Sequence, residues 1–154
     1  MLSKGESMEE FMDEAIKEAK KSIKTGDVPV GAIIVKDGKI IARAHNTKEK
    51  KQCAVNHAEV LAIIKASKKI GNFRLDDCDI YITKEPCLMC IGAILSARIK
   101  KIYFGAYDKK FGAIEFASNN NFNHTCEHEG GIKKDTCEKL LSNFFKEIRA
   151  CKSN

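Results

Sequence analysis

Two short stretches of the chain contain residue types that could hold a metal ion and move protons. His57 begins one of them, and Cys87 and Cys90 form a Cys-x-x-Cys pair in the other. One histidine and two cysteines would fill three positions of a zinc tetrahedron and leave the fourth to water, as in catalytic zinc sites. Glu59 follows His57 closely enough to face the same cavity without being a ligand. We therefore predict that His57, Cys87 and Cys90 bind one Zn²⁺ per chain, with Glu59 as the catalytic acid and base.

Other interpretations of Cys87 and Cys90 are a redox pair or half of a closed structural zinc site. A closed site would need a fourth Cys or His at regular spacing, whereas Cys126 and Cys137 stand well apart in the sequence. A redox pair does not explain the His-Ala-Glu stretch. The combined pattern favours the open site, and it resembles the His-x-Glu and Pro-Cys-x-x-Cys signature of the zinc nucleobase deaminases.

The predicted metal ligands must be positioned by the starts of two helices. A Cys-x-x-Cys pair in a first helical turn can direct both sulfur atoms to one ion, and the free N–H groups there favour thiolate over thiol. Pro86 suits the start of such a helix, which we expect over 88–97. A second helix should follow Glu59, because apolar residues recur on one side of the segment 60–66.

A sheet is expected to connect and support these helices. Five strands are predicted, at 30–35, 39–44, 79–83, 101–105 and, as a short last strand, 126–129. The first is apolar throughout, so it should be central and covered on both faces. Asp37-Gly38 predicts a tight antiparallel hairpin to the second strand. The strand, helix, strand order that follows implies a right-handed parallel crossover.

Helices are also expected at both ends of the chain. Ser7 to Glu10 has the pattern of a capping box for a first helix that ends near Gly26, and Asp135 should open the last helix. We expect a polar loop over 47–56, and a short helix and a loop over 106–123. The fold class is therefore α/β, with three α/β/α layers around a central mixed five-stranded sheet. The two halves of the zinc site should lie at helix N-termini that face each other across the sheet edge.

Length and composition limit the function further. The 154 residues suit a single domain spanning 1–154. The 27 basic against 21 acidic residues give a net charge of +6, which is compatible with a polyanionic partner without proving one. Membrane and secretory classes are not favoured, because there is no long apolar run and the N-terminus does not resemble a signal peptide. Seven cysteines, an odd number, indicate a reducing, cytoplasmic compartment.

Beyond the zinc motif, the chain resembles the tRNA-specific adenosine deaminases, which convert the wobble adenosine of an anticodon to inosine. The likeness covers nearly the whole length. It includes Asp27–Ala32, His45-Asn46, Asn72 with Arg74-Leu75, Thr83 with Glu85–Cys90, Ser96 with Arg98-Ile99, Phe104–Ala106 with Asp108, Gly112-Ala113, Asn123-His124, Leu140-Leu141 and Phe144-Phe145. The stretches after the zinc motif distinguish it best from deaminases of free nucleosides.

The resemblance implies a cytidine-deaminase-like fold, a homodimer with sites near its interface, and the anticodon stem-loop of a tRNA as substrate. It assigns Asn46 to a hydrogen bond with the flipped purine, and Val30 and Ala58 to walls or backbone contacts of the purine pocket. Asp108 would lie in the part of the chain along the anticodon loop. For Asn46, the alternative interpretation is a residue that only caps a turn.

The C-terminal helix would also lie near the RNA, with Lys146, Arg149 and Lys152, although a merely solvated face is the alternative for these cations. Two departures from the family concern the surroundings of the pocket. Residues 53–56, immediately before the histidine, lack the Pro-Thr or similar pair that the family usually has there. Lys84 occupies a position that is commonly apolar. Neither departure affects the metal ligands, and both bear on the RNA preference.

The function predicted from the sequence is hydrolytic deamination of wobble adenosine in a tRNA anticodon. The alternative within the same class is a deaminase of a free base or nucleoside such as guanine or cytidine. The alternative of a different class is a catalytically silent, zinc-bearing subunit that binds RNA or a partner. The intact Glu59 argues against a silent subunit.

Overall fold

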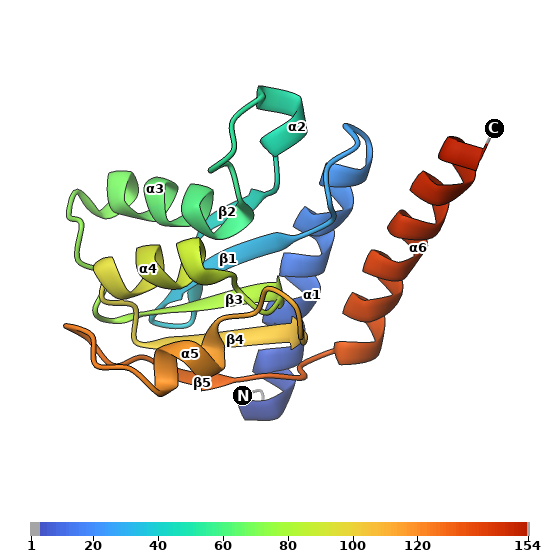
Figure 1. The fold of residues 1–154 in the computed structure, drawn as a ribbon. Helices are drawn as coiled ribbons and strands as arrows, with labels where there is room; N and C mark the ends of the chain where they lie inside the picture. Colours follow the sequence, from blue (N-terminus) through green and yellow to red (C-terminus); the bar gives the residue numbers. More distant parts are fainter. Residues whose placement is uncertain (1–3, 154) are drawn as a thin grey trace.

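A mixed five-stranded sheet runs through the centre of the molecule (Figure 1). The computed structural model describes residues 4–153, and its strand order is β2-β1-β3-β4-β5. The strands are Gly31–Lys36 (β1), Lys39–His45 (β2), Cys78–Lys84 (β3), Lys101–Ala106 (β4) and Glu127–Glu129 (β5). β1 is antiparallel to both of its neighbours, whereas β3, β4 and β5 are parallel to one another. The central mixed five-stranded sheet is thereby confirmed.

Helices cover both faces of this sheet. They are Lys4–Ile23 (α1), Lys48–Lys51 (α2), Ala58–Ile70 (α3), Leu88–Ser96 (α4), Ile114–Ser118 (α5) and Lys134–Ser153 (α6). In Figure 1, α3, α4 and α5 lie on one side of the sheet, and α1 and α6 lie on the other. The predicted three-layer α/β/α arrangement is confirmed. Among the described residues, no helix combines the length and the apolar character needed to cross a bilayer.

Alternate residues of the strands pack into two separate cores. One core joins Ile34, Ile80 and Ile82 to α3 and α4. The other joins Ile33 and Tyr81 to α1 and the start of α6. Because successive side chains of a strand point to opposite faces, a central strand covered on both sides has to be apolar throughout. This explains the uninterrupted apolar run of β1.

The connection between the first two strands is the predicted hairpin. Asp37 and Gly38 both have positive φ values, of 51° and 74°. Two successive residues in this region form the tight turn whose twist matches that of paired antiparallel strands. β1 and β2 pair from Gly31 with His45 to Lys36 with Lys39. The turn and a one-residue shift in the pairing between Ile34 and Val35 together bring the end of β2 back beside the start of β1.

Three local predictions differ from the structure. α1 begins at Lys4, so Ser7 lies within the helix and does not open it. The expected loop 47–56 contains the single turn of α2, which depends on a distant carboxylate described below. α3 and α4 start side by side on one face of the sheet and not across its edge, because both bury their apolar sides in the same core.

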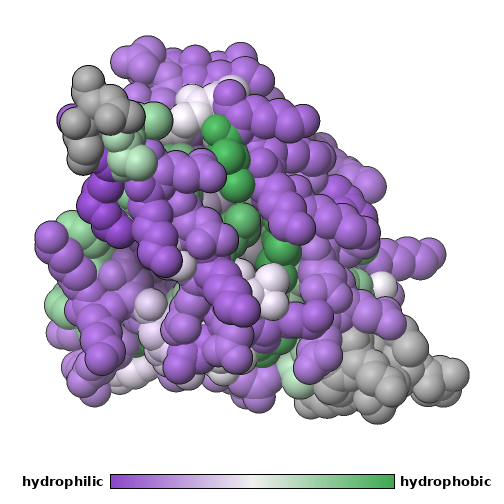
Figure 2. Space-filling model, turned by 90° about the vertical axis from the view of Figure 1, so that its right-hand side faces the viewer, coloured by the Kyte–Doolittle hydropathy of each residue, from purple (hydrophilic) through white to green (hydrophobic). Residues whose placement is uncertain are grey.

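α6 lies on an otherwise hydrophilic side of the molecule. Figure 2 shows that side, with a narrow apolar stripe between polar surfaces. An apolar groove of about 320 Å³ separates α6 from the end of α1 and is lined by residues that include Ile23, Phe144 and Ile148. α6 thus packs through a limited set of side chains, with Cys137 and Phe144 buried and most of its other residues exposed.

Candidate metal centre and pocket

Three potential metal ligands meet where α3 and α4 begin. His57 precedes the first residue of α3, and Cys87 precedes that of α4. The His57 Nδ1 atom lies 3.7 Å from the Cys87 Sγ atom and 3.5 Å from the Cys90 Sγ atom. All three ligand atoms lie within 4.8 Å of one another. Within residues 4–153, this is the group of His, Cys, Asp and Glu side chains arranged to hold a metal ion.

The geometry of this group fits zinc. Zinc bonds of about 2.3 Å to sulfur and about 2.0–2.1 Å to nitrogen place the two atoms about 3.6 Å apart in a tetrahedron. The observed separations of 3.5 and 3.7 Å bracket that value. One nitrogen and two sulfur donors are also the ligand types that zinc prefers. The three residues therefore suit a zinc ion with one open position.

The two thiols have opposite acidities in this arrangement. Contacts with Cys90 and then His57 lower the pKa of Cys87 to about 3. The contact with Cys87, followed by burial, raises the pKa of Cys90 above its usual value. One thiolate is therefore favoured without help, whereas a second buried thiolate beside it needs a cation for balance. This requirement is what a divalent metal at the centre would meet.

Glu59 lies next to the metal centre in the first turn of α3 and is only 4% exposed. Burial raises its pKa above the usual value, although its own backbone N–H and the Cys90 thiol favour the charged form and oppose that rise. A buried carboxyl with a raised pKa is suited to accept a proton and to give it up again. The structure thus places a buried carboxyl beside the predicted ligands.

The site opens into a pocket of about 470 Å³. His57, Glu59 and Cys87 line this pocket together with three of the predicted substrate-binding residues, Val30, Asn46 and Asp108. The fourth, Ala58, is fully buried and lies outside the lining. The volume is typical of a small-molecule site. A larger cavity of about 620 Å³ lies between α4, α5 and β5, and its lining contains none of these residues.

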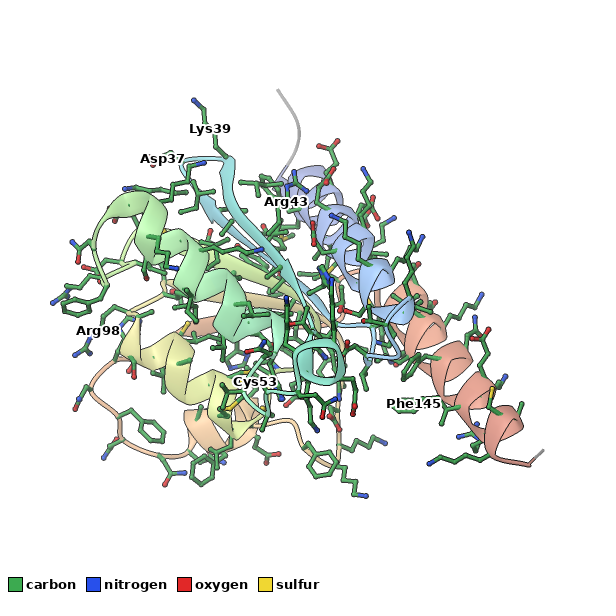
Figure 3. The ribbon with its side chains drawn as sticks, turned by 90° about the horizontal axis from the view of Figure 1, so that it is seen from above. Asp37, Lys39, Arg43, Cys53, Arg98 and Phe145 are labelled. Atoms are coloured by element: carbon green, nitrogen blue, oxygen red, sulfur yellow. The ribbon has the colours of Figure 1, made fainter. Side chains whose placement is uncertain are left out.

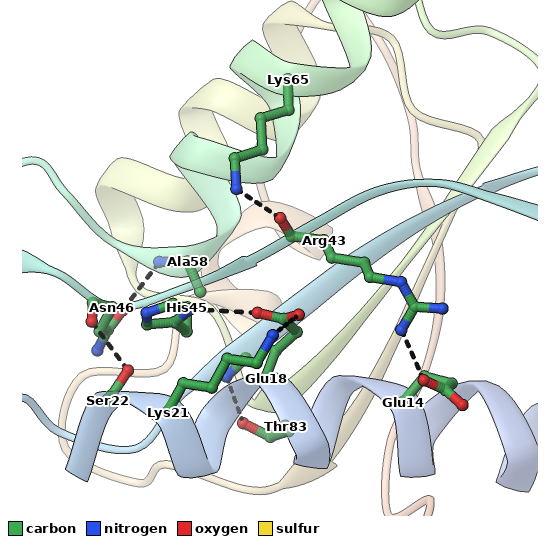
Figure 4. Close-up of polar contacts among 11 residues, drawn as sticks. Glu14, Glu18, Lys21, Ser22, Arg43, His45, Asn46, Ala58, Lys65 and Thr83 are labelled. Carbon is green, nitrogen blue, oxygen red and sulfur yellow. Dashed lines mark hydrogen bonds and ion pairs between the residues drawn. The ribbon is translucent and has the colours of Figure 1, made fainter. Parts of the chain in front are cut away.

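Asn46 ties the pocket to the start of α3. Its Oδ1 atom accepts a hydrogen bond of 2.8 Å from the Ala58 backbone N–H, and its Nδ2 atom donates one of 3.1 Å to the Val28 carbonyl oxygen. Figure 4 shows Asn46 beside Ala58 and Ser22, whose hydroxyl donates to the Asn46 carbonyl oxygen. The side chain therefore satisfies a free N–H of the helix. One Nδ2 hydrogen and one Oδ1 lone pair remain for a ligand.

A buried aspartate holds the segment that precedes His57. The Asp27 carboxylate accepts hydrogen bonds from the backbone N–H groups of Glu49 at 2.6 Å and Lys50 at 3.2 Å. The Thr25 hydroxyl donates to the same carboxylate at 2.7 Å. Asp27 thus caps α2 from a distant part of the chain, and the preceding residue of that turn, Lys48, reaches the pocket.

The opposite wall of the pocket is held by Glu85. Its carboxylate accepts hydrogen bonds from the backbone N–H groups of Asp108 at 3.1 Å and Ile114 at 3.3 Å. The Ala113 N–H donates to the Pro86 carbonyl oxygen at 2.9 Å. A Cβ atom at Gly112 would collide with the Glu85 side chain, which explains the need for glycine there. The wall segment 107–113 is thereby fixed against the residues that precede Cys87.

Sequence reasoning missed two aromatic residues of the pocket, Phe111 and Phe145. Phe111 is a lone apolar residue within a polar turn, which was a usable signal. Phe145 directly follows Phe144 in the last helix, but Phe144 is buried whereas Phe145 is 41% exposed. Figure 3 shows Phe145 projecting from α6 toward the body of the molecule.

The cations predicted to lie near RNA occupy the same helix as Phe145. Lys146, Arg149 and Lys152 are exposed on α6. Lys84, the departure from the family pattern, lines the pocket and forms an ion pair of 2.9 Å with Asp108. Basic side chains thus lie both at the pocket and on the neighbouring helix.

We expect Asn46→Ala to lower the free energy of unfolding by about 1–2 kcal/mol, because α3 loses its cap and Val28 loses a hydrogen bond. Urea denaturation followed by circular dichroism measures this loss. Asn120→Ala is the matched control, since its amide bonds an exposed carbonyl oxygen on the surface. Equal stability of the two variants would contradict the capping role of Asn46.

Comparisons with known proteins agree with the geometry of the site. The chain matches the family described as MafB19-like deaminase over residues 6–149. It is 45% identical over 143 residues to a tRNA-specific adenosine deaminase of Bacillus subtilis, and the match covers 90% of this chain and 89% of that one.

Solved structures give the same picture. One, from a study of A-to-I editing by tRNA deaminases at the wobble position of transfer RNA, is 37% identical with a TM-score of 0.83, covering 86% of this chain and 99% of that one. A guanine deaminase from Bacillus subtilis is 36% identical with a TM-score of 0.64, covering 77% of this chain and 82% of that one.

Proposed function

Because the chain belongs to the MafB19-like deaminase family and to the tRNA-specific adenosine deaminases, we propose that it converts the wobble adenosine of a tRNA anticodon to inosine by hydrolysis. The observation that carries the proposal is the meeting of His57, Cys87 and Cys90 beside the buried Glu59 in one pocket. The proposed catalytic unit is a single domain formed by residues 1–154, with one Zn²⁺ held by the three ligands.

The proposed reaction exchanges the amino group of adenosine for oxygen from water. When bound, zinc would act as a Lewis acid that makes a water-derived nucleophile available near neutral pH. Glu59 accepts a proton as water attacks the ring carbon that bears the amino group. It then delivers protons to the ring nitrogen and to the leaving amine. Adenosine and water are consumed, and inosine and ammonia are formed.

The pocket supplies the groups proposed to orient the base. Asn46 would form hydrogen bonds with the flipped purine through its remaining Nδ2 hydrogen and Oδ1 lone pair. Val30 would form an apolar wall of the purine pocket. Ala58 would contribute indirectly, because its backbone N–H donates a hydrogen bond that orients the Asn46 side chain. Asp108 is proposed to lie beside the RNA, held by Lys84.

A tRNA substrate is supported by the charge around the pocket. Lys48 lines it, and the chain carries a net charge of +6. An anticodon stem-loop presents a phosphate backbone that such cations attract. Lys146, Arg149 and Lys152 on α6 would extend the same surface. The protein is accordingly proposed to act on tRNA in the cytoplasm.

Deamination of free guanine is the second candidate, because a guanine deaminase shares 36% identity with this chain. The tRNA deaminase structure is the closer match of the two in shape, with a TM-score of 0.83 against 0.64. It also shares a larger part of the chain, 86% against 77%. We therefore favour the tRNA substrate.

The active form is proposed to be a homodimer. Leu88, Met89, Phe116 and Phe122 are exposed apolar residues on α4, α5 and the segment that follows α5. The rings of Phe116 and Phe122 lie 6.2 Å apart, and both line one hollow with Leu88. A second copy covering this surface would bury these side chains and place the interface next to Cys87.

The proposed activity is tested directly with an anticodon stem-loop that carries adenosine at the wobble position. Free adenosine, cytidine and guanine are incubated in parallel, and inosine and ammonia are quantified. We expect inosine in the RNA and no ammonia from the free compounds. If ammonia formed only from a free compound, that compound and not tRNA would be the substrate, and the proposed zinc chemistry would still hold.

Glu59→Ala should retain zinc but lose turnover by at least about 10²–10⁴-fold, because the buried carboxyl beside the three ligands is the group proposed to move the protons. Inosine formation gives the rate, and elemental analysis of the purified variant gives the zinc content. Glu115→Ala on the surface of α5 is the control and should match the wild type. Near-normal turnover of Glu59→Ala would remove Glu59 from the mechanism.

Cys87→Ala should lose both zinc and activity, because a metal with a single thiolate and one histidine is held far less well. The matched control is Cys151→Ala, at an exposed position near the end of α6. Zinc per chain is measured for both proteins after dialysis without added metal. A full complement of zinc in Cys87→Ala would overturn the assignment of this ligand.

A further inference from the structure

Phe111 is an exposed aromatic residue at the pocket that the proposed chemistry does not use. Its side chain is 62% exposed, and it lines the same pocket as His57 and Glu59. Neither of the two apolar cores includes it. A ring placed in this way offers a flat apolar face beside the reacting centre.

Hydrogen bonds and an ion pair hold the turn that carries Phe111 in place. The Asp108 Oδ1 atom accepts hydrogen bonds of 3.1 Å from the backbone N–H groups of both Lys110 and Phe111. The Asp108 Oδ2 atom pairs with the Lys84 ammonium at 2.9 Å. Glu85 in turn binds the backbone N–H of Asp108. Phe111 is therefore presented by an ordered turn, which reduces the entropy lost when a ligand contacts it.

Two lysine side chains lie near this ring. The Lys110 Nζ atom lies 5.2 Å from the centre of the Phe111 ring. Lys48 lines the pocket nearby. Proteins bind single-stranded nucleic acid by combining aromatic rings, on which bases stack, with cations that follow the backbone. The surroundings of Phe111 have both components.

We propose that Phe111 stacks on the nucleotide next to the flipped adenosine and so determines which anticodon loops bind productively. This rests on the proposed function, because it requires a polynucleotide substrate. Lys84 is a positioning residue in this arrangement, since it acts on the ring only through Asp108. A free base has no flanking nucleotide and would gain nothing from Phe111.

The experiment compares the wild type and Phe111→Ala on three stem-loops. One is intact, and the other two lack the base on the 5′ or the 3′ side of the target adenosine. On the intact loop we expect kcat/KM to fall by about 5- to 150-fold, which corresponds to the stacking of one base. On one of the two abasic loops the wild type should already be slower, and Phe111→Ala should cause no further loss. Phe111→Tyr should retain the wild-type value on every loop.

Phe73→Ala is the matched control, because Phe73 is 71% exposed and lies outside the pocket lining. It should behave as the wild type. Lys84→Met should lower kcat/KM on the intact loop, as Phe111→Ala does. The double variant should show no further loss beyond that of Phe111→Ala. Equal losses from Phe111→Ala on all three loops, or no loss on the intact loop, would overturn the proposal. Dissociation of Phe111→Ala into monomers would also overturn it, since the ring would then belong to a subunit contact.

Dissociation constants of the same loops, measured by fluorescence anisotropy, separate this proposal from the proposed function. If the wild type binds the intact loop, and Phe111→Ala raises the dissociation constant only when the flanking base is present, the stacking proposal is supported even if no inosine forms. Absence of inosine from the bound wild-type loop would then count against the reaction alone. Failure of the wild type to bind the loop would overturn both.

Discussion

The site depends on the close approach of two helix starts that belong to distant parts of the chain. α3 contributes His57 just before its first residue, and α4 contributes Cys87 in the same position and Cys90 one turn later. The nitrogen and sulfur atoms meet only because both helices pack side by side in one core above the sheet. Burial of Ala58, Ala62, Ile91 and Ile94 in that core holds the two helix starts together.

Carboxylate and amide side chains perform the finer positioning around the pocket. Asp27, Asn46 and Glu85 each accept hydrogen bonds from backbone N–H groups of another segment. Each of these acceptors satisfies a backbone donor that would otherwise be left without a partner at the start of a helix or in a turn. The three walls of the pocket are therefore joined to one another through the backbone and do not depend on a ligand for their shape.

Features that local chemistry determines could be predicted from the sequence, and features that arise from distant contacts could not. The hairpin at Asp37 follows from two neighbouring residues, and the grouping of His57 with Cys87 and Cys90 follows from the ligand preferences of zinc. The α2 turn could not be predicted, because its capping carboxylate on Asp27 lies 22 residues before Glu49 in the sequence. The exposure of Phe145 depends on how α6 meets the sheet, which its helical periodicity does not reveal.

The wall segment 107–113 has a consequence for how such an enzyme can diversify. Hydrogen bonds from its backbone to the Glu85 carboxylate and the Pro86 carbonyl oxygen fix its two ends, and Gly112 pairs with Cys87, whereas Lys110 and Phe111 at its tip are exposed. The side chains at the tip can therefore change without changing the residues that fix the ends of the segment. Natural or laboratory selection can exchange its side chains to accept another loop sequence, while the catalytic machinery beneath keeps its geometry.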